Sequence, residues 1–266
     1  MYRICLGICL LAYMGCVSPK IQLPNNPNTL TGEDFYKQVW QMQWKQRDSV
    51  ATVSILKGNI PSFLRKFVPV QIRSFDSTTN TWNKATIWVL PDYLCIGTND
   101  NWARIPLTPL AAQPIADSLH CFLPTKKLVN DIYASAKVKL DPVPMYIFRD
   151  STVTMWQHHL IIEGQRKNRK GLIAGIKKDV VITDLLTRSS KPNRVAIFGW
   201  HKPDGIPIQP LYTGHVNWYV DYSHGIRLVY EYLLVNGKRM HYTDVMKNSS
   251  FRKLITDENF ADVFRY

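Results

Sequence analysis

The sequence predicts an α+β fold, in which helices pack on a mixed, mainly antiparallel sheet. Two kinds of periodicity predict it: apolar residues recur at helical spacing in some segments, and alternate with polar residues in others that are rich in β-branched and aromatic side chains. The segments do not follow the regular strand-helix-strand order of a Rossmann core. Hydrophobic residues make up 45% of the chain, which is enough to fill a substantial core.

The first half is expected to begin with a helix over 33–57, because Thr31 and Asp34 form a capping pattern before apolar residues at helical spacing. A short helical turn follows at 61–67. The period then changes to two, which predicts strands at 68–75, 81–89 and 93–97. Helical spacing returns at 107–119 and 125–136.

The second half continues with a helix at 153–165 and strands at 179–183, 194–200 and 216–220. Residues 226–242 predict a hairpin, because its Asn236-Gly237 pair accepts the positive φ angles of a tight turn. Two short helices are expected to close the chain.

Residues 1–15 have the composition of an export signal. Arg3 supplies a positive start, 4–14 are apolar, and Gly15 precedes Cys16. The apolar run is too short to span a bilayer, which takes about 20 residues. The pattern resembles a bacterial lipoprotein signal, although Tyr13 stands where that motif prefers leucine. The resemblance implies that Cys16 is lipidated and anchors an exported protein to the bacterial cell envelope, in the periplasm or at the outer membrane; an ordinary cleaved signal is the alternative.

Residues 16–30 are expected to form a flexible tether, because prolines alternate there with asparagines. Residues 31–266 then form a single α+β domain, in which 31–67 could be a helical appendage. The formal charge of +13 falls to +12 once Arg3 leaves with the signal. Lysines and arginines occur in short clusters without a nucleic-acid motif, so we expect no nucleic-acid partner. Anionic lipids, acidic glycans or cell-wall polymers suit a basic exported chain, and an ordinary solvated surface is the alternative.

Cys95 and Cys121 are the two thiols of the expected domain. They could form one disulfide, or one could be a nucleophile. Cys121 precedes the helix predicted at 125–136, and a helix N-terminus lowers the pKa of a thiol. The alternative is a small apolar core residue.

The run 214–228 concentrates functional groups, since it holds His215, His224, Asp221 and Ser223 beside aromatic residues. If 221–223 form a turn, both imidazoles can return to neighbouring strands and face one cleft as a general base and its orienter. Structural or surface histidines are the alternative.

The order of Cys121, a helix and the later Gly214-His215-Val216 is similar to that of NlpC-type cell-wall cysteine peptidases. The resemblance implies that Cys121 is the nucleophile, His215 the base and His224 the orienting residue. The chain departs from that family at His120 and Phe122-Leu123, which replace Asp and Ser-Gly around the cysteine. The expected function is therefore an envelope-tethered cysteine hydrolase that cleaves an amide bond in cell-wall peptide or a related substrate without a cofactor. A non-catalytic envelope lipoprotein that binds glycan or a protein partner is the alternative.

Trp200, Trp218 and Tyr222 are the candidate walls of the substrate cleft. The segment 223–228 also looks like the Ser-His-Gly-Cys-x-Arg signature of L,D-transpeptidases, but it lacks the catalytic cysteine. His159 and Glu163 share a predicted helix face, yet the order HExxH is missing, so no metal site is expected. More generally, 123–228 looks like exported bacterial proteins of unassigned function. The sequence leaves the oligomeric state open.

Overall fold

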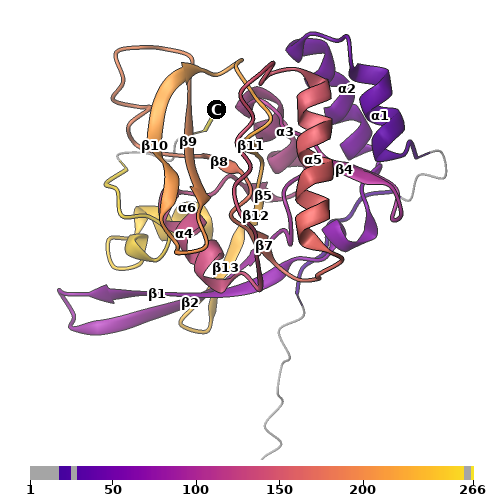
Figure 1. Cartoon of the computed structure of the whole chain (residues 1–266). Coiled ribbons are helices and arrows are strands. Elements are labelled where there is room, and N and C mark those ends of the chain that lie inside the picture. The colour runs from indigo at the N-terminus through magenta and orange to yellow at the C-terminus, as the bar shows by residue number, and fades with distance from the viewer. Residues whose placement is uncertain (1–17, 25–28, 261–264) are drawn as a thin grey trace, which may run out of the picture.

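The computed structural model describes residues 18–24, 29–260 and 265–266. The predicted signal, Cys16 and part of the tether lie outside these residues. Two lobes stand above a long β-hairpin (Figure 1). One lobe holds helices α1 (Gly32–Val39), α2 (Trp44–Leu56), α3 (Pro109–Ser118) and α5 (Thr152–Arg166). The other holds a four-stranded sheet and helix α4 (Lys126–Ser135). The α+β prediction is confirmed.

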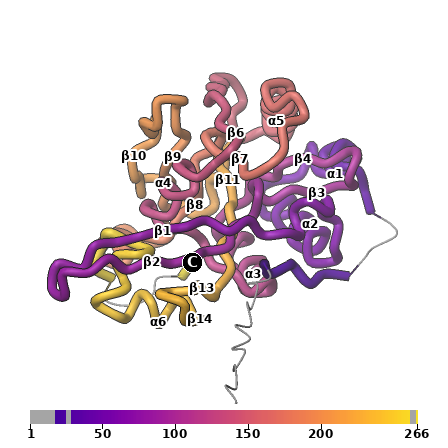
Figure 2. The backbone as a smooth tube through the Cα atoms, turned by 90° about the horizontal axis from the view of Figure 1, so that it is seen from below, coloured from indigo at the N-terminus to yellow at the C-terminus, as the bar shows by residue number. Residues whose placement is uncertain are grey.

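The larger sheet is built on the hairpin of β1 (Val68–Asp76) and β2 (Thr81–Val89), which pair from Val68↔Val89 to Asp76↔Thr81. Its remaining strands are β5 (Cys121–Phe122), β12 (Val229–Tyr230), β13 (Tyr232–Val235) and β14 (Lys238–His241), in the order β14-β13-β2-β12-β5. Seen from below, the hairpin has α6 (Tyr242–Lys247) on one side and α4 on the other, and α1 and α2 lie at the right of the view, away from the tip of the hairpin (Figure 2).

The smaller sheet has the order β10-β9-β8-β11 and carries the candidate site. Its strands are β8 (Lys178–Val181), β9 (Arg194–His201), β10 (Pro207–Val216) and β11 (His224–Gly225). Two further pairs join β3 (Cys95–Gly97) to β4 (Trp102–Arg104), and β6 (Val138–Lys139) to β7 (Ile173–Ala174). The short 3-10 helices η1 (Ser62–Arg65) and η2 (Arg252–Leu254) complete the described elements.

The prediction of one helix over 33–57 is wrong, because the chain breaks between α1 and α2. Trp40 ends the first helix, and its carbonyl accepts a hydrogen bond from the Thr152 hydroxyl of α5. Gln43 is extended at the start of the second helix. Asp48 then accepts two hydrogen bonds from Thr108, which caps α3. Contacts with other helices therefore override local helical preference at this break.

The prediction of a strand at 216–220 is also wrong, because β10 ends at Val216 and a loop follows. The turn of the predicted hairpin is confirmed at Asn236 and Gly237, whose φ angles are 47° and 83°. Its first strand is shorter than predicted, since residues 229–230 belong to β12, which pairs with β2 and β5.

The main hydrophobic core runs through both lobes and includes Phe35, Ile55 and Leu64 from the segment 31–67. A buried charged network lies within it. Arg104 donates two hydrogen bonds to Asp92 at 2.8 and 2.7 Å. Bidentate pairing of this kind is what allows charged groups to be buried.

Candidate functional site

His215 and His224 lie on β10 and β11, the two edge strands of the smaller sheet, and their ring centres are 6.1 Å apart. Neighbouring strands lie about 4.8 Å apart, so the two edge strands of a flat four-stranded sheet would lie more than twice as far apart as these two rings. The pairing of β10 with β9 has two register shifts, on either side of Tyr212, and irregularities of this kind bend a strand out of a flat sheet. The structure thus brings the two predicted histidines together, although their strands are not neighbours.

Asp221 lies in the loop between these strands and holds the loop together through hydrogen bonds. Its buried carboxylate accepts hydrogen bonds from the Ser223 hydroxyl at 2.5 Å, the Ser223 amide at 2.8 Å, Arg149 at 2.8 Å and the Tyr219 hydroxyl at 3.3 Å. Burial acts to raise the pKa of this carboxyl, but His224, Ser223 and Arg149 together lower it to about 2. The Ser223 hydroxyl is buried and donates to Asp221, which does not suit it to act as a nucleophile.

Both imidazoles are neutral at pH 7. Burial lowers the pKa of His224 to about 4, although Asp221 acts in the opposite direction. Burial also lowers the pKa of His215, and Lys178 and Arg149 lower it further. Nε2 of His224 is 4.0 Å from Oδ1 of Asp221, beyond hydrogen-bond distance, and has no hydrogen-bond partner in the part of the chain that the structure describes.

Lys178 is the basic residue closest in the sheet to His224, because β8 and β11 pair in parallel with these two residues opposite each other. Lys178 as a whole is only 7% exposed, and its ammonium lies 5.0 Å from the centre of the Trp200 ring. Among the described residues, this ammonium forms no hydrogen bond and no ion pair within 4 Å. Burial lowers the pKa of Lys178, whereas Asp221 raises it. The Nζ atom itself is not fully buried, so solvent reaches this ammonium and an anionic group can approach it.

An unusual backbone conformation near the end of β9 places the Trp200 ring beside Lys178. Gly199 and Trp200 have φ angles of 110° and 58°, so two successive residues break the alternation of β9. As a result Trp200 joins the same core cluster as Ile197, while His201 contacts Phe198 on the other face at 5.8 Å. Nε1 of Trp200 is buried and lacks a hydrogen-bond partner among the described residues.

The three predicted cleft walls have different positions. Trp218 is 43% exposed and lines a groove of about 420 Å³ with Tyr219, Val216, Trp40 and Trp44. Trp200 and Tyr222 are buried and line none of the five described grooves and pockets. Tyr222 has a structural role, since its hydroxyl accepts from the Met145 amide and its carbonyl accepts from Lys177.

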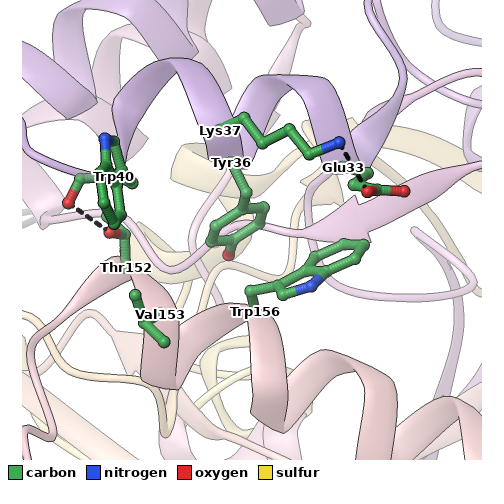
Figure 3. Close-up of a pocket in the computed structure, with 7 residues that line it drawn as sticks. All are labelled: Glu33, Tyr36, Lys37, Trp40, Thr152, Val153 and Trp156. Atoms are coloured by element: carbon green, nitrogen blue, oxygen red, sulfur yellow. Dashed lines mark hydrogen bonds and ion pairs between the residues drawn. The ribbon is translucent and has the colours of Figure 1, made fainter.

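This groove continues into an aromatic pocket of about 410 Å³ between α1 and α5, and the two share Trp40 and Thr152. Figure 3 shows Tyr36 between Trp40 and Trp156, with the Glu33–Lys37 ion pair at one end. Because Tyr219 contacts His215 at 4.6 Å, aromatic side chains extend from the histidines to this pocket.

Cys121 does not lie at a helix N-terminus, so the expected lowering of its pKa is corrected. It lies in β5 of the larger sheet, opposite Tyr230, and α4 begins only after Thr125. Burial, with a smaller effect of Glu231, raises the pKa of Cys121 well above its usual value. Its thiol donates to the Leu119 carbonyl at 3.2 Å. This environment is typical of an unreactive core thiol.

Cys95 and Cys121 are both free, so the disulfide alternative is also corrected. Cys95 is buried in β3, and its thiol donates to the Tyr93 carbonyl at 2.9 Å. Burial, with Asp92, raises its pKa well above the usual value. Neither thiol therefore has the electropositive, accessible surroundings of a nucleophile.

The histidines of α5 face buried cations. Nδ1 of His158 lies 3.2 Å from Nζ of Lys177, and Nδ1 of His159 lies 3.4 Å from Nη1 of Arg104. Burial and these cations lower the pKa values of both imidazoles. No group of three or more potential His, Cys, Asp or Glu ligands occurs in the described ranges.

Sequence reasoning missed Lys178 and Arg149 as parts of the site. Lys178 belongs to the pair Lys177-Lys178 and Arg149 stands alone before Asp150, so neither is conspicuous in the sequence, and only long-range pairing places them beside Asp221 and His224. No family model, curated protein or solved structure matches the chain. Within residues 18–24, 29–260 and 265–266, no helix has the length and apolar character needed to cross a membrane.

Proposed function

We propose that this protein is a non-catalytic, envelope-tethered binding protein, and that its ligand is a cell-wall peptide with a free carboxylate. The carboxylate binds beside Lys178, and the rest of the ligand extends along the aromatic groove from Trp218 to Trp40. The observation that carries the proposal is the largely buried Lys178 residue, whose ammonium keeps contact with solvent and has no hydrogen-bond or ion-pair partner among the described side chains.

The charges near Lys178 support an anionic ligand. Arg149 is already paired with Asp221, so Lys178 is the cation available for a new partner. Unpartnered N–H groups favour the same chemistry: Nε1 of Trp200 carries a hydrogen, and Nε2 of His224 carries one in one of its two neutral tautomers. His215, which is partly exposed, and Arg149 give solvent access at this end of the site.

The groove supports a ligand longer than a single anion. Trp218, Trp44 and Trp40 provide large flat surfaces, and aromatic residues of this kind contribute most of the contact energy in many binding sites. The adjoining pocket adds Tyr36 and Trp156. Polar lining residues such as Gln41, Gln43 and Asp150 suit the amides of a peptide.

The cysteine hydrolase remains a prediction that the geometry does not favour. Its proposed nucleophile Cys121 is buried in the larger sheet, whereas its proposed base His215 lies in the smaller one. Incubation of the protein with cell-wall peptide, followed by mass spectrometry, tests this function. Cleavage that is lost in Cys121→Ala would replace the binding proposal with the thiol mechanism.

The binding test is calorimetric titration with a soluble cell-wall disaccharide-peptide and with the same compound amidated at its free carboxylates. We expect only the carboxylate form to bind well. Lys178→Gln should weaken its binding by about 1.5–3 kcal/mol, the usual contribution of a hydrogen bond to a charged group. Trp218→Ala should also weaken binding, because it removes groove surface.

Lys238→Gln is the matched control, since Lys238 is exposed on β14 of the other sheet. It should bind as the unchanged protein does. Equal affinity for the carboxylate and amide forms, or unchanged affinity in Lys178→Gln, would refute the proposed site. The anchor is tested separately: palmitate labelling of the protein in bacteria should be lost in Cys16→Ala if the lipoprotein assignment is right.

A further inference from the structure

The hairpin of β1 and β2 has an outer face that no other described element covers. Burial alternates along β1, so that Val70, Ile72 and the residues in phase with them face the body, where α4 and η2 contact the strand. The residues between them, from Pro69 to Phe75, are exposed on the other side. Because the two lobes stand above the hairpin, this outer face lies on the underside of the molecule (Figure 1).

Two cations stand directly opposite each other on the outer face. Arg73 of β1 pairs in register with Lys84 of β2, and both residues are exposed. Neither forms an ion pair within 4 Å with a carboxylate in the part of the chain that the structure describes. Like charges at directly opposed positions destabilise a sheet, so the fold itself gives no reason for this pair.

A third cation, Arg239, lies on the same face. Gln71, Thr86, Leu234 and Arg239 form one row across β1, β2, β13 and β14, since each is paired in register with the next. The Arg239 guanidinium lies 3.8 Å from the centre of the Tyr232 ring and has no carboxylate within 4 Å among the described residues.

The acidic side chains of these strands are engaged elsewhere. The Asp76 carboxylate is buried on the inner face, where it accepts a hydrogen bond from the Thr78 amide at 2.9 Å. Glu231, which precedes β13, lies 3.2 Å from Nδ1 of His120 and 3.7 Å from Nε2 of His241. The three cations of the outer face are therefore available to an anionic partner.

The tip of the hairpin adds two exposed aromatic rings. Phe75 and Trp82 are 41% and 55% exposed, and their ring centres are 5.4 Å apart. The Arg73 guanidinium lies 5.0 Å from the centre of the Trp82 ring, so charge and ring are side by side. Exposed aromatic residues next to lysine or arginine are typical of surfaces that enter the headgroup region of a bilayer.

The first described residues lie at the base of the same hairpin. Lys20 forms an antiparallel bridge with Lys66, two residues before β1. Ile21 is buried and its amide donates to the Arg65 carbonyl at 2.9 Å, so this part of the expected tether is fixed to the domain. Cys16 precedes Lys20 by four residues, which span at most about 14 Å when extended. A lipid on Cys16 would therefore hold the base of the hairpin close to a bilayer.

We infer that the outer face of this hairpin docks on the surface of an anionic lipid bilayer. Arg73, Lys84 and Arg239 contact lipid phosphates, and the rings of Phe75 and Trp82 enter the headgroup region. A lipid surface explains the exposed rings and the position of the first described residues, which a soluble polyanion would not. The inference rests on the envelope tether of the proposed function and is independent of its peptide site.

The test is co-sedimentation of the full chain with vesicles of phosphatidylglycerol and phosphatidylcholine in equal parts, and with vesicles of phosphatidylcholine alone. The anionic vesicles should bind more strongly, and salt should weaken this binding. Arg73→Gln/Lys84→Gln should bind them about 30-fold more weakly, because each cation near such a surface contributes about fivefold in affinity. The same variant should be at least as stable to heat, since it removes the repulsion between the paired cations. Weaker binding would then not come from unfolding.

Lys191→Gln/Lys202→Gln is the matched control, because it removes two exposed lysines that flank β9 of the smaller sheet. It should bind the vesicles as the unchanged protein does. All variants keep the same residues 1–30, so vesicle binding by that segment is equal among them. Equal affinity for anionic and neutral vesicles, or equal losses in the two double variants, would overturn the inference.

Quenching of tryptophan fluorescence by brominated lipids locates the contact. It should fall in Trp82→Phe but not in Trp218→Phe, which removes another exposed tryptophan; the opposite result would place a different face on the bilayer. Binding to heparin without binding to vesicles would reassign the face to a soluble polyanion. Arg73→Gln/Lys84→Gln should bind the cell-wall peptide as the unchanged protein does, which separates a failure of this inference from a failure of the peptide site.

Discussion

Replacement of Asp221 by Asn tests the electrostatic account of the histidine loop. The Asp221 carboxylate is 1% exposed, so solvent screens its interactions only weakly. It accepts four hydrogen bonds, of which those from Ser223 hold the backbone between β10 and β11. Asparagine keeps the size of the side chain and one acceptor oxygen but removes the charge.

The expected loss of stability follows from the pKa of this carboxyl. Its value is about 2 in the folded protein, against an ordinary value of 3.8. This difference corresponds to about 2 kcal/mol of stability, which is present above pH 4 and is lost as the pH falls toward 2. Asp221→Asn should therefore be about 2 kcal/mol less stable at pH 7, and the difference should shrink below pH 3.

Urea unfolding at pH 7, 4 and 2.5 measures this difference, and NMR titration of the histidines supplies a second readout. Asp221 raises the pKa values of His215 and His224, so both should fall in the variant. A merely structural defect would not predict this direction. Asp204→Asn is the control, because that carboxylate lies in an exposed turn and its removal should have little effect. Equal stability of Asp221→Asn and the unchanged protein at pH 7 would refute the reasoning.

Three further predictions follow from buried groups. Cys95 and Cys121 should react with a thiol reagent only after denaturation; rapid labelling of the folded protein would contradict their burial and raised pKa values. Burial raises the pKa of Asp179 to about 7, so the protein should become less stable as the pH rises from 4 to 7. Asp179→Asn should remove this loss and stabilise the protein at pH 8 by up to about 4 kcal/mol. Urea unfolding measures the difference. Gly199→Ala should destabilise by at least about 1 kcal/mol in thermal or urea unfolding, because φ is 110° there and the new methyl group would lie 3.2 Å from Val129; unchanged stability would contradict the assigned backbone.

The order and type of most elements could be predicted from the sequence because these features depend on local periodicity. Residues 81–89 alternate as a strand and form β2 over the same span, and Asn236-Gly237 forms the turn that its chemistry predicts. Short strands such as β5 and β11 were missed, since two residues carry no detectable period. The break after Val39 was missed because its cause, Thr152, is far away in the chain.

The sequence by itself determined the α+β class and singled out the run from His215 to His224. Only the tertiary structure decided which groups contact these residues and so what their pKa values and reactivity are, because both depend on burial and on partners from distant segments. It buried Cys121 in one sheet and placed the histidines in another, with Asp221 and Arg149 in the loop between them. It also left the Lys178 ammonium beside Trp200 without a described ion-pair partner, which no local pattern in the chain could indicate.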